Sequence, residues 1–308
     1  MFRKLGSNGV FMVLFQPYIG RVLRRLHYHY SKDPVDDQWR GWNWDRPPLR
    51  PRGLFGLSIG DVVNEYCPVR RDVWIRKVLK LKPRPSRPLI IGKIIHTIFH
   101  MTYTLFLEAV VKYEEPDVIY SYMLRAFQDK IEAEGVNGDD LIWATKLFKK
   151  LAYSLIGYMC IKTMWHPGSR GYEGILWLTE YHVDGSILGL SKNLRVDATA
   201  EGIVVEIKYG KPLEFHKHAL AGYALALEAE YETPFNYGLI VYIDKIMNGT
   251  PEITYTPVYI NTILRMRFIE KRDQVIDMLF MEKEPKKPLK NECPESCPYY
   301  YVCWGGGS

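Results

Sequence analysis

The stretch Leu194-Arg-Val-Asp-Ala-Thr-Ala-Glu-Gly-Ile-Val-Val-Glu-Ile-Lys-Tyr209 decides the fold that this sequence predicts. Two runs rich in apolar and β-branched residues flank Glu201-Gly202, a pair typical of a two-residue hairpin turn in which glycine takes the positive φ. With this turn, Ala200 pairs with Ile203 in an antiparallel hairpin. The apolar residues throughout the second strand indicate a buried, central position in a sheet.

The same register brings three charged side chains onto one face of the hairpin. Counting outward from the turn places Asp197 opposite Glu206, and strand alternation puts Lys208 on the face of Glu206. Two facing carboxylates repel unless a cation lies between them, and magnesium or manganese prefers oxygen ligands. The lysine can orient or deprotonate a water beside the metal and stabilise charge on a phosphate. We therefore favour a metal site over a salt-bridged, solvated hairpin.

Composition limits the class of protein. The 308 residues are 47% hydrophobic and 25% charged, which is ordinary for a globular protein of one large domain or two small ones. The net charge of +6 suits a polyanionic partner, although many basic proteins bind no nucleic acid. The apolar run 10–15 is too short to span a bilayer, and no small-residue cleavage site follows it. We expect an intracellular, cytoplasmic protein with no membrane segment and reduced thiols.

Helical patterns come first along the chain, and strands follow. Helices are predicted over 57–66, 89–111, 117–134, 139–163, 216–231 and 261–279, and strands over 176–183, 187–190, 194–200, 203–209, 237–243 and 253–258. Residues 1–56 read as a basic, proline- and tryptophan-rich extension without an assigned role, and its clustered tryptophans predict that part of it packs on the body. Residues 305–308 read as a flexible tail.

Two histidines, His96 and His100, lie four residues apart on the apolar helix 89–111 and so share a face. Three interpretations are open: buried core residues, a zinc pair, or one histidine that completes the metal site at Asp197 and Glu206. The residues by themselves do not choose among them.

Four cysteines form a second candidate site. Cys293, Cys297 and Cys303 lie within eleven residues, and Cys67, like Cys293 and Cys297, is followed by a proline. In a reducing compartment such a group is typical of metal binding, and both zinc and iron–sulfur clusters accept four cysteines. Three clustered cysteines and one remote one favour iron–sulfur, which would hold the two ends of the chain together.

Taken together, these motifs resemble those of the RecB-type nucleases of the PD-(D/E)xK superfamily. More closely, over residues 57–304, the chain resembles the CRISPR-associated "Cas-four" exonucleases, in an archaeal-type variant. Gly92-Lys-Ile-Ile-His96 is similar to the helical G-x3-H motif of that family, Arg195-Val-Asp197 to its metal-binding aspartate, and Glu206-Ile-Lys208 to its ExK pair. The cysteines are similar to the one-plus-three arrangement that holds a four-iron, four-sulfur cluster, here Cys67, Cys293, Cys297 and Cys303.

The resemblance implies an α/β, restriction-endonuclease-like fold: a mixed central sheet flanked by helices, with N- and C-terminal segments joined by the cluster. It implies magnesium- or manganese-dependent cleavage of single-stranded DNA from the 5′ end, in the trimming of prespacers. Its implied partners are the CRISPR integrase subunits, and some members form homo-oligomers. By this resemblance Asp197, Glu206 and Lys208 are catalytic; His96, Asp197, Glu206 and the Ile207 carbonyl bind metal; and Tyr223, Arg70 and Arg71 contact DNA.

One departure keeps alternatives open. The family carries a Q-x3-Y motif after the ExK strand; Tyr223 fits it, but Ala219 occupies the glutamine position. An iron–sulfur DNA-binding subunit with a vestigial nuclease site is therefore one alternative. A RecB-like nuclease in replication or repair is another, although no G-x4-G-K-[ST] helicase motif occurs in the sequence.

Overall fold

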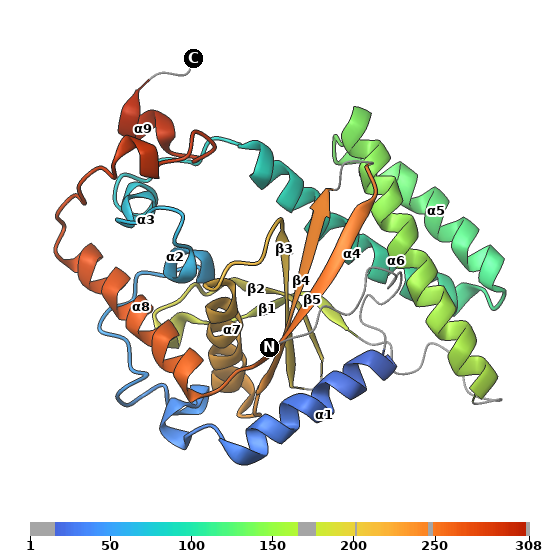
Figure 1. Ribbon diagram of the computed structural model, residues 1–308, viewed down its shortest axis with the longest axis horizontal. Helices are drawn as coiled ribbons and strands as arrows, with labels where there is room; N and C mark the ends of the chain where they lie inside the picture. Colours follow the sequence, from blue (N-terminus) through green and yellow to red (C-terminus); the bar gives the residue numbers. More distant parts are fainter. Residues whose placement is uncertain (1–15, 166–176, 201, 246–248, 306–308) are drawn as a thin grey trace. The chain divides into compact units, whose positions relative to one another are not determined.

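The computed structural model describes residues 16–165, 177–200, 202–245 and 249–305 (Figure 1). It divides into two compact units. Unit 1 comprises Met1–Arg25, Ile94–Trp177 and Asp244–Ile253, and unit 2 comprises Leu26–Lys93, Leu178–Ile243 and Thr254–Ser308.

A five-stranded mixed sheet lies mostly in unit 2. Its strands follow one another in space as they do in sequence: β1 (Leu178–Val183), β2 (Leu194–Ala200), β3 (Ile203–Tyr209), β4 (Tyr237–Lys245) and β5 (Pro251–Tyr259). Strands β1, β2 and β3 are antiparallel, and β3 and β4 are parallel, joined by the crossover helix α7 (His216–Tyr231). The predicted α/β class with a mixed sheet is confirmed.

The hairpin of β2 and β3 has the register that its sequence predicts. Ala200 pairs with Ile203, and the ladder continues to Ala198 and Val205. Gly202 takes a φ of +80°, which only glycine adopts without strain. Glu201, the other turn residue, lies outside the described residues.

The core of unit 2 lies between the sheet and two helices, with α7 next to the strands and α8 (Thr262–Phe280) packed on α7 (Figure 1). Gly222 permits this close packing, because a Cβ there would come within 2.4 Å of the Phe268 ring. The buried cluster joins both helices to the strands through Val196, Val204, Leu220, Ala224, Ile240 and Phe268.

Glu228 on α7 holds the segment 37–43 to this core. Its side chain is completely buried, and its carboxylate accepts hydrogen bonds from the guanidinium groups of Arg40 and Arg265 at 2.6–2.9 Å. The backbone amides of Gly41 and Phe235 donate to it as well, both at 2.9 Å. The short 3-10 turn Gly41–Asn43 is thereby held against α7, and the turn before it, Asp37–Trp39, packs on α8, as the clustered tryptophans predict.

Helices α4 (Arg87–Lys112), α5 (Pro116–Ala133) and α6 (Gly138–Trp165) supply most of unit 1, and α1 (Gln16–Lys32) begins there. Helices α5 and α6 lie side by side (Figure 1), with the rings of Phe127 and Phe148 stacked 4.0 Å apart. Among the described residues, α4 is the one helix long and apolar enough to cross a membrane by length and composition. Because 56% of its most apolar stretch is buried in the protein, it resembles a core helix.

Two local predictions are wrong. The strand expected over 187–190 is a 3-10 turn, Ser186–Leu188, because the chain turns at Gly189 with a φ of +75°. The helix expected over 57–66 is α2 (Ile59–Val63), which begins at the predicted cap Ser58. It ends early because the Arg70 guanidinium binds the carbonyls of Val62 and Asn64, in place of further helical N–H groups.

Besides α1 and the turns Asp37–Trp39 and Gly41–Asn43, three short elements of unit 2 were not predicted. They are α3 (Arg71–Lys77), the 3-10 turn Lys290–Glu292 and α9 (Tyr300–Trp304). All three adjoin the cysteine residues that the sequence singles out, so the local structure there consists of short helices and turns.

Candidate active site

Strands β2 and β3 bring the predicted carboxylates and lysine together. Asp197 and Glu206 are 9% and 4% exposed, so each carboxylate is removed from bulk water. The Asp197 carboxylate accepts a hydrogen bond of 2.6 Å from the amide of Ile207 on the neighbouring strand. The Lys208 ammonium forms an ion pair with Glu206. The pairing ladder and these contacts place the three side chains on one face of unit 2.

Strand β1 adds a carboxylate that the sequence analysis missed. Thr179 pairs with Ala198 and Tyr181 with Val196, so Glu180 lies across from Asp197. A carboxylate oxygen of Glu180 lies within 4.8 Å of one of Asp197. Its backbone takes a φ of +52°, a conformation that non-glycine residues adopt at a cost and that recurs at functional sites.

Arg195, on the same strand as Asp197, pairs with Glu180 at 2.6 Å. The named groups of this face are therefore three carboxylates against one guanidinium and one ammonium. We refer to Glu180, Asp197, Glu206 and Lys208 as the carboxylate face.

The carboxylate face sets the charge of its lysine. Burial pushes the pKa of Lys208 down, but the carboxylates of Glu206 and Asp197 outweigh burial and leave that pKa raised. Lys208 is therefore an ammonium at neutral pH. Burial, together with Glu206, Asp197 and Glu180, also raises the pKa of the Tyr223 hydroxyl well above its ordinary value. Tyr223 is thus a protonated hydroxyl beside the carboxylates.

The remaining residues of the predicted metal site are placed as follows. His96 lies on α4 in unit 1, in the part of that helix that begins at Ile94, whereas the carboxylate face belongs to unit 2. The amide of Ile207 donates to Asp197, and metal binding by its carbonyl stays a prediction. Ala219, at the position of the family's glutamine, is 1% exposed and packs in the core of unit 2.

All four predicted cluster cysteines belong to unit 2, and all are free thiols. Burial, with smaller contributions from the neighbouring Cys293 and Cys67, raises the pKa of Cys297 to about 11. Cys303 is buried against Trp74 and Tyr299. The chain's ends thus gather these thiols in one region, although no three of their sulfurs form a compact ligand group among the described residues.

The two arginines predicted to contact DNA make hydrogen bonds within the protein. Arg70 donates to the carbonyls of Val62 and Asn64, as described above. Arg71 is 5% exposed and binds the Glu284 carboxylate and the Pro285 carbonyl. These contacts tie the residues that follow Cys67 to the segment that precedes Cys293. Contact of the two arginines with DNA stays a prediction.

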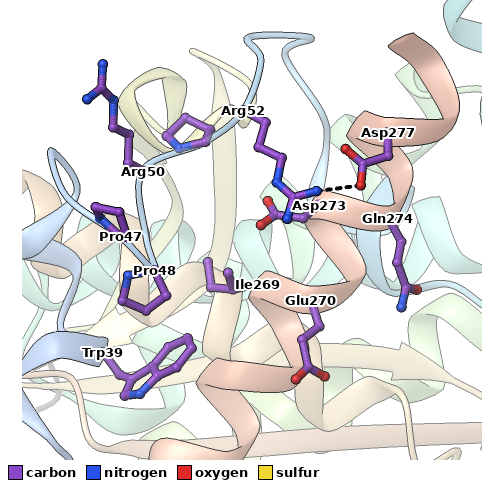
Figure 2. A pocket seen from close by; sticks show the side chains of 11 residues that line it. Trp39, Pro47, Pro48, Arg50, Arg52, Ile269, Glu270, Asp273, Gln274 and Asp277 are labelled. Atoms are coloured by element: carbon purple, nitrogen blue, oxygen red, sulfur yellow. Dashed lines mark hydrogen bonds and ion pairs between the residues drawn. The ribbon is translucent and has the colours of Figure 1, made fainter. Parts of the chain in front are cut away.

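A surface cleft of about 580 Å³ lies elsewhere in unit 2, between the segment 39–52 and α8 (Figure 2). Figure 2 shows Trp39, Pro47 and Pro48 on one side, and Glu270 and Asp277 on the helix opposite. An ion pair of 2.7 Å between Arg52 and Asp277 crosses it. The cleft contains none of the predicted site residues.

Comparison with known proteins identifies the family. The family model described as CRISPR-associated exonuclease Csa1 matches residues 12–306. A protein of Thermoproteus tenax named CRISPR-associated exonuclease Csa1 is 32% identical over 289 residues, which cover 92% of this chain and 97% of that protein. A protein of Saccharolobus solfataricus with the same name is 31% identical over 282 residues, 87% of this chain and 92% of that protein. The chain therefore belongs to the family of CRISPR-associated exonuclease Csa1.

Proposed function

We propose that this exonuclease hydrolyses DNA phosphodiesters at the carboxylate face, with a divalent cation bound by Glu180, Asp197 and Glu206. The observation that carries the proposal is the gathering of these side chains beside a charged Lys208, with two of the carboxylates nearly buried. Neighbouring carboxylates repel one another and are costly to bury, so a site that collects three of them on one face is suited to a cation.

The donor set fits magnesium or manganese. Both are hard cations that take carboxylate oxygens, and three adjacent strands supply them here. From the family resemblance, the ring of His96 and the carbonyl of Ile207 would complete the coordination. When bound, the cation polarises the scissile phosphate and lowers the pKa of a water that attacks it.

The chain's own groups have separate tasks in this proposal. Lys208, held as an ammonium, stabilises the negative charge that develops on the phosphate and orients the attacking water. Asp197 is fixed by the Ile207 amide, so its carboxylate stays aimed at the site. Tyr223, whose raised pKa keeps it protonated, can donate a hydrogen bond to a phosphate oxygen.

For the biological substrate, we propose single-stranded DNA, degraded from the 5′ end during the trimming of prespacers. Support comes from the family, whose name links it to CRISPR systems, and from the net charge of +6. CRISPR integrase subunits are the proposed partners, with a homo-oligomer as a further assembly and the cytoplasm as the compartment. The polarity of cleavage rests on the resemblance described above.

We further propose that Cys67, Cys293, Cys297 and Cys303 hold a four-iron, four-sulfur cluster. The support is their location in one region of unit 2 with free thiols. A cubane cluster spaces its ligands more widely than a single ion does, because each thiolate binds a different iron. Its proposed role is to join the two ends of the domain.

The experiment is digestion of 5′-labelled single-stranded DNA with manganese or magnesium, comparing the wild type, Lys208→Ala and Lys211→Ala. Lys211 is an exposed lysine three residues further on, so its variant controls for the loss of one positive charge. We expect metal-dependent digestion that is lost in Lys208→Ala and kept in Lys211→Ala. Equal digestion by the wild type and Lys208→Ala would refute the proposed site. Salt-sensitive DNA binding without digestion by any variant would favour the vestigial binding subunit.

A further inference from the structure

Tyr66 is an exposed aromatic residue next to the first cysteine. Its side chain is 57% exposed, although it follows α2 directly in a well-packed part of unit 2. The ring lies edge-on against Phe215, with centroids 5.2 Å apart and planes at 90°. One face of an aromatic ring is thus held in place and offered to solvent.

A row of rings continues from Tyr66 into the protein. Phe215 contacts His216 at 4.8 Å, and His216 contacts Tyr242 at 5.6 Å between centroids. The His216 Nδ1 and the Tyr242 hydroxyl are 3.2 Å apart, within hydrogen-bond distance. Tyr242 on β4 is the register partner of Lys208 on β3. The row therefore leads from the exposed ring to the strand position of the proposed catalytic lysine.

Only the first ring of this row is accessible. Phe215, His216 and Tyr242 are 8%, 2% and 3% exposed, so they form a buried backing that cannot itself receive a ligand. The ring of Tyr66 is therefore positioned by packing from behind.

Electrostatics agree that Tyr66 lies near the carboxylate face. Burial raises the pKa of Tyr66, and the Lys208 ammonium opposes that rise. Burial, with a smaller contribution from Lys208, lowers the pKa of His216 to about 4, so this histidine is neutral at physiological pH. A neutral ring adds no charge that would repel Lys208 or attract a second phosphate. The row is thus an uncharged aromatic support beside Lys208.

We propose that Tyr66 is a positioning residue that stacks against the base of a nucleotide whose phosphate lies at Lys208. Every base has a π face, so a lone aromatic platform holds nucleotides without selecting a sequence. A base within a duplex is already stacked and paired, so the same platform favours single strands or unpaired ends. This inference rests on the proposed function and names the part of the substrate that reaches the site.

The decisive test removes either the ring or the base. Single-stranded substrates carry one abasic site, moved through the first four nucleotides of the labelled end, and are digested by the wild type and Tyr66→Ala. We expect one abasic position to lower kcat/KM of the wild type about tenfold, mainly through KM. Tyr66→Ala should show that loss on normal DNA and less than a twofold further loss at the abasic position.

Three variants separate stacking from packing. Tyr66→Phe should behave as the wild type, because stacking needs the ring and not the hydroxyl. Tyr66→Leu keeps an apolar side chain against Phe215 and should behave as Tyr66→Ala, and it carries the test if the alanine variant does not fold. Tyr28→Ala removes another exposed tyrosine, 61% accessible and outside the row, and should keep the wild-type pattern.

A binding measurement gives the same answer without turnover. With EDTA present to prevent turnover, 2-aminopurine at the sensitive position should be quenched when the wild type binds the DNA, and Tyr66→Leu should abolish the quenching. Equal abasic penalties in the wild type and Tyr66→Leu, with equal quenching, would overturn the role of Tyr66. That result is distinct from failure of the proposed function, which would appear as full digestion by Lys208→Ala.

Discussion

Two groups of buried carboxylates in unit 2 have opposite surroundings. Glu228 is enclosed by the guanidinium groups of Arg40 and Arg265 and by two backbone amides, so cations outnumber the carboxylate. On the carboxylate face, three carboxylates outnumber Lys208 and Arg195. The first arrangement satisfies its charge within the protein and holds two segments together. The second leaves a negative balance that suits an added cation.

This difference separates stability from activity. Removing one partner of a buried, satisfied ion pair leaves a buried charge and is strongly destabilising. Removing one of several carboxylates that repel each other relieves that repulsion and leaves the fold intact. The same substitution, glutamate to glutamine, should therefore have opposite consequences at the two places.

The largest expected effect is on catalysis. Glu206→Gln should lower the digestion rate on the order of 10⁴-fold, about 5 kcal/mol of transition-state stabilisation, because the cation loses a ligand. Lys208 keeps the Asp197 carboxylate nearby, so its ammonium is not left alone. Thermal unfolding should occur at the wild-type temperature or slightly above. A Glu206→Gln protein that unfolds at a lower temperature and digests DNA at the wild-type rate would contradict this assignment, since it would make Glu206 a structural residue.

The next effect is on folding. Glu228→Gln should lower the free energy of unfolding by about 3–5 kcal/mol, because Arg40 and Arg265 are left without their carboxylate in a buried site. Denaturant titration measures this loss. The surviving folded fraction should digest DNA at the wild-type rate per molecule, in contrast to Glu206→Gln. Loss of activity in the folded fraction would show that the two carboxylate groups are not independent.

His216 is a third kind of buried titratable group in unit 2, because it is kept neutral and, among the described residues, is neither paired with an opposite charge nor placed to bind a cation. Its pKa is lowered from 6.5 to about 4, so the unfolded chain binds a proton more readily than the folded one. The corresponding stability is complete above pH 6.5 and is lost as the pH falls towards 4, by roughly 2–4 kcal/mol. Chemical denaturation at pH 7 and pH 4.5 should show a smaller acid loss in His216→Gln than in the wild type. An equal loss of unfolding free energy in both proteins would show that other groups cause the acid sensitivity.

A substitution in the cysteine region should destabilise the protein less than Glu228→Gln does, and it should change the absorption spectrum clearly. If the four thiols hold an iron–sulfur cluster, Cys297→Ser should remove the brown colour of the protein and lower its thermal midpoint by several degrees. Absorbance and metal analysis on anaerobically purified protein measure this. Colourless wild-type protein with stoichiometric zinc would replace the cluster by a zinc site.

The sequence predicted the parts of the site that depend on local pairing. The register of Ala200 with Ile203 follows from the two-residue turn, and it brings Asp197, Glu206 and Lys208 to one face. Glu180 could not be placed in this way. Its position depends on how β1 pairs with β2 across a connection that contains a 3-10 turn and the positive φ of Gly189.

Other parts depend on contacts distant in sequence. The pairing of Arg40 with Glu228 joins positions 188 residues apart, and neither residue belongs to a recognisable motif. The apolar run 187–190 has a pattern typical of a strand. In the structure the chain turns there, because Gly189 adopts a positive φ. The hydrogen bonds of Arg70 to Val62 and of Arg71 to Pro285 likewise could not be predicted from the charge of the two arginines.

The most direct test of the central claim is calorimetric titration of manganese into the protein, comparing the wild type with Asp197→Asn and Glu228→Gln. We predict binding by the wild type, a loss of that binding in Asp197→Asn, and unchanged binding by folded Glu228→Gln. Equal manganese binding by the wild type and Asp197→Asn would contradict a metal site on the carboxylate face.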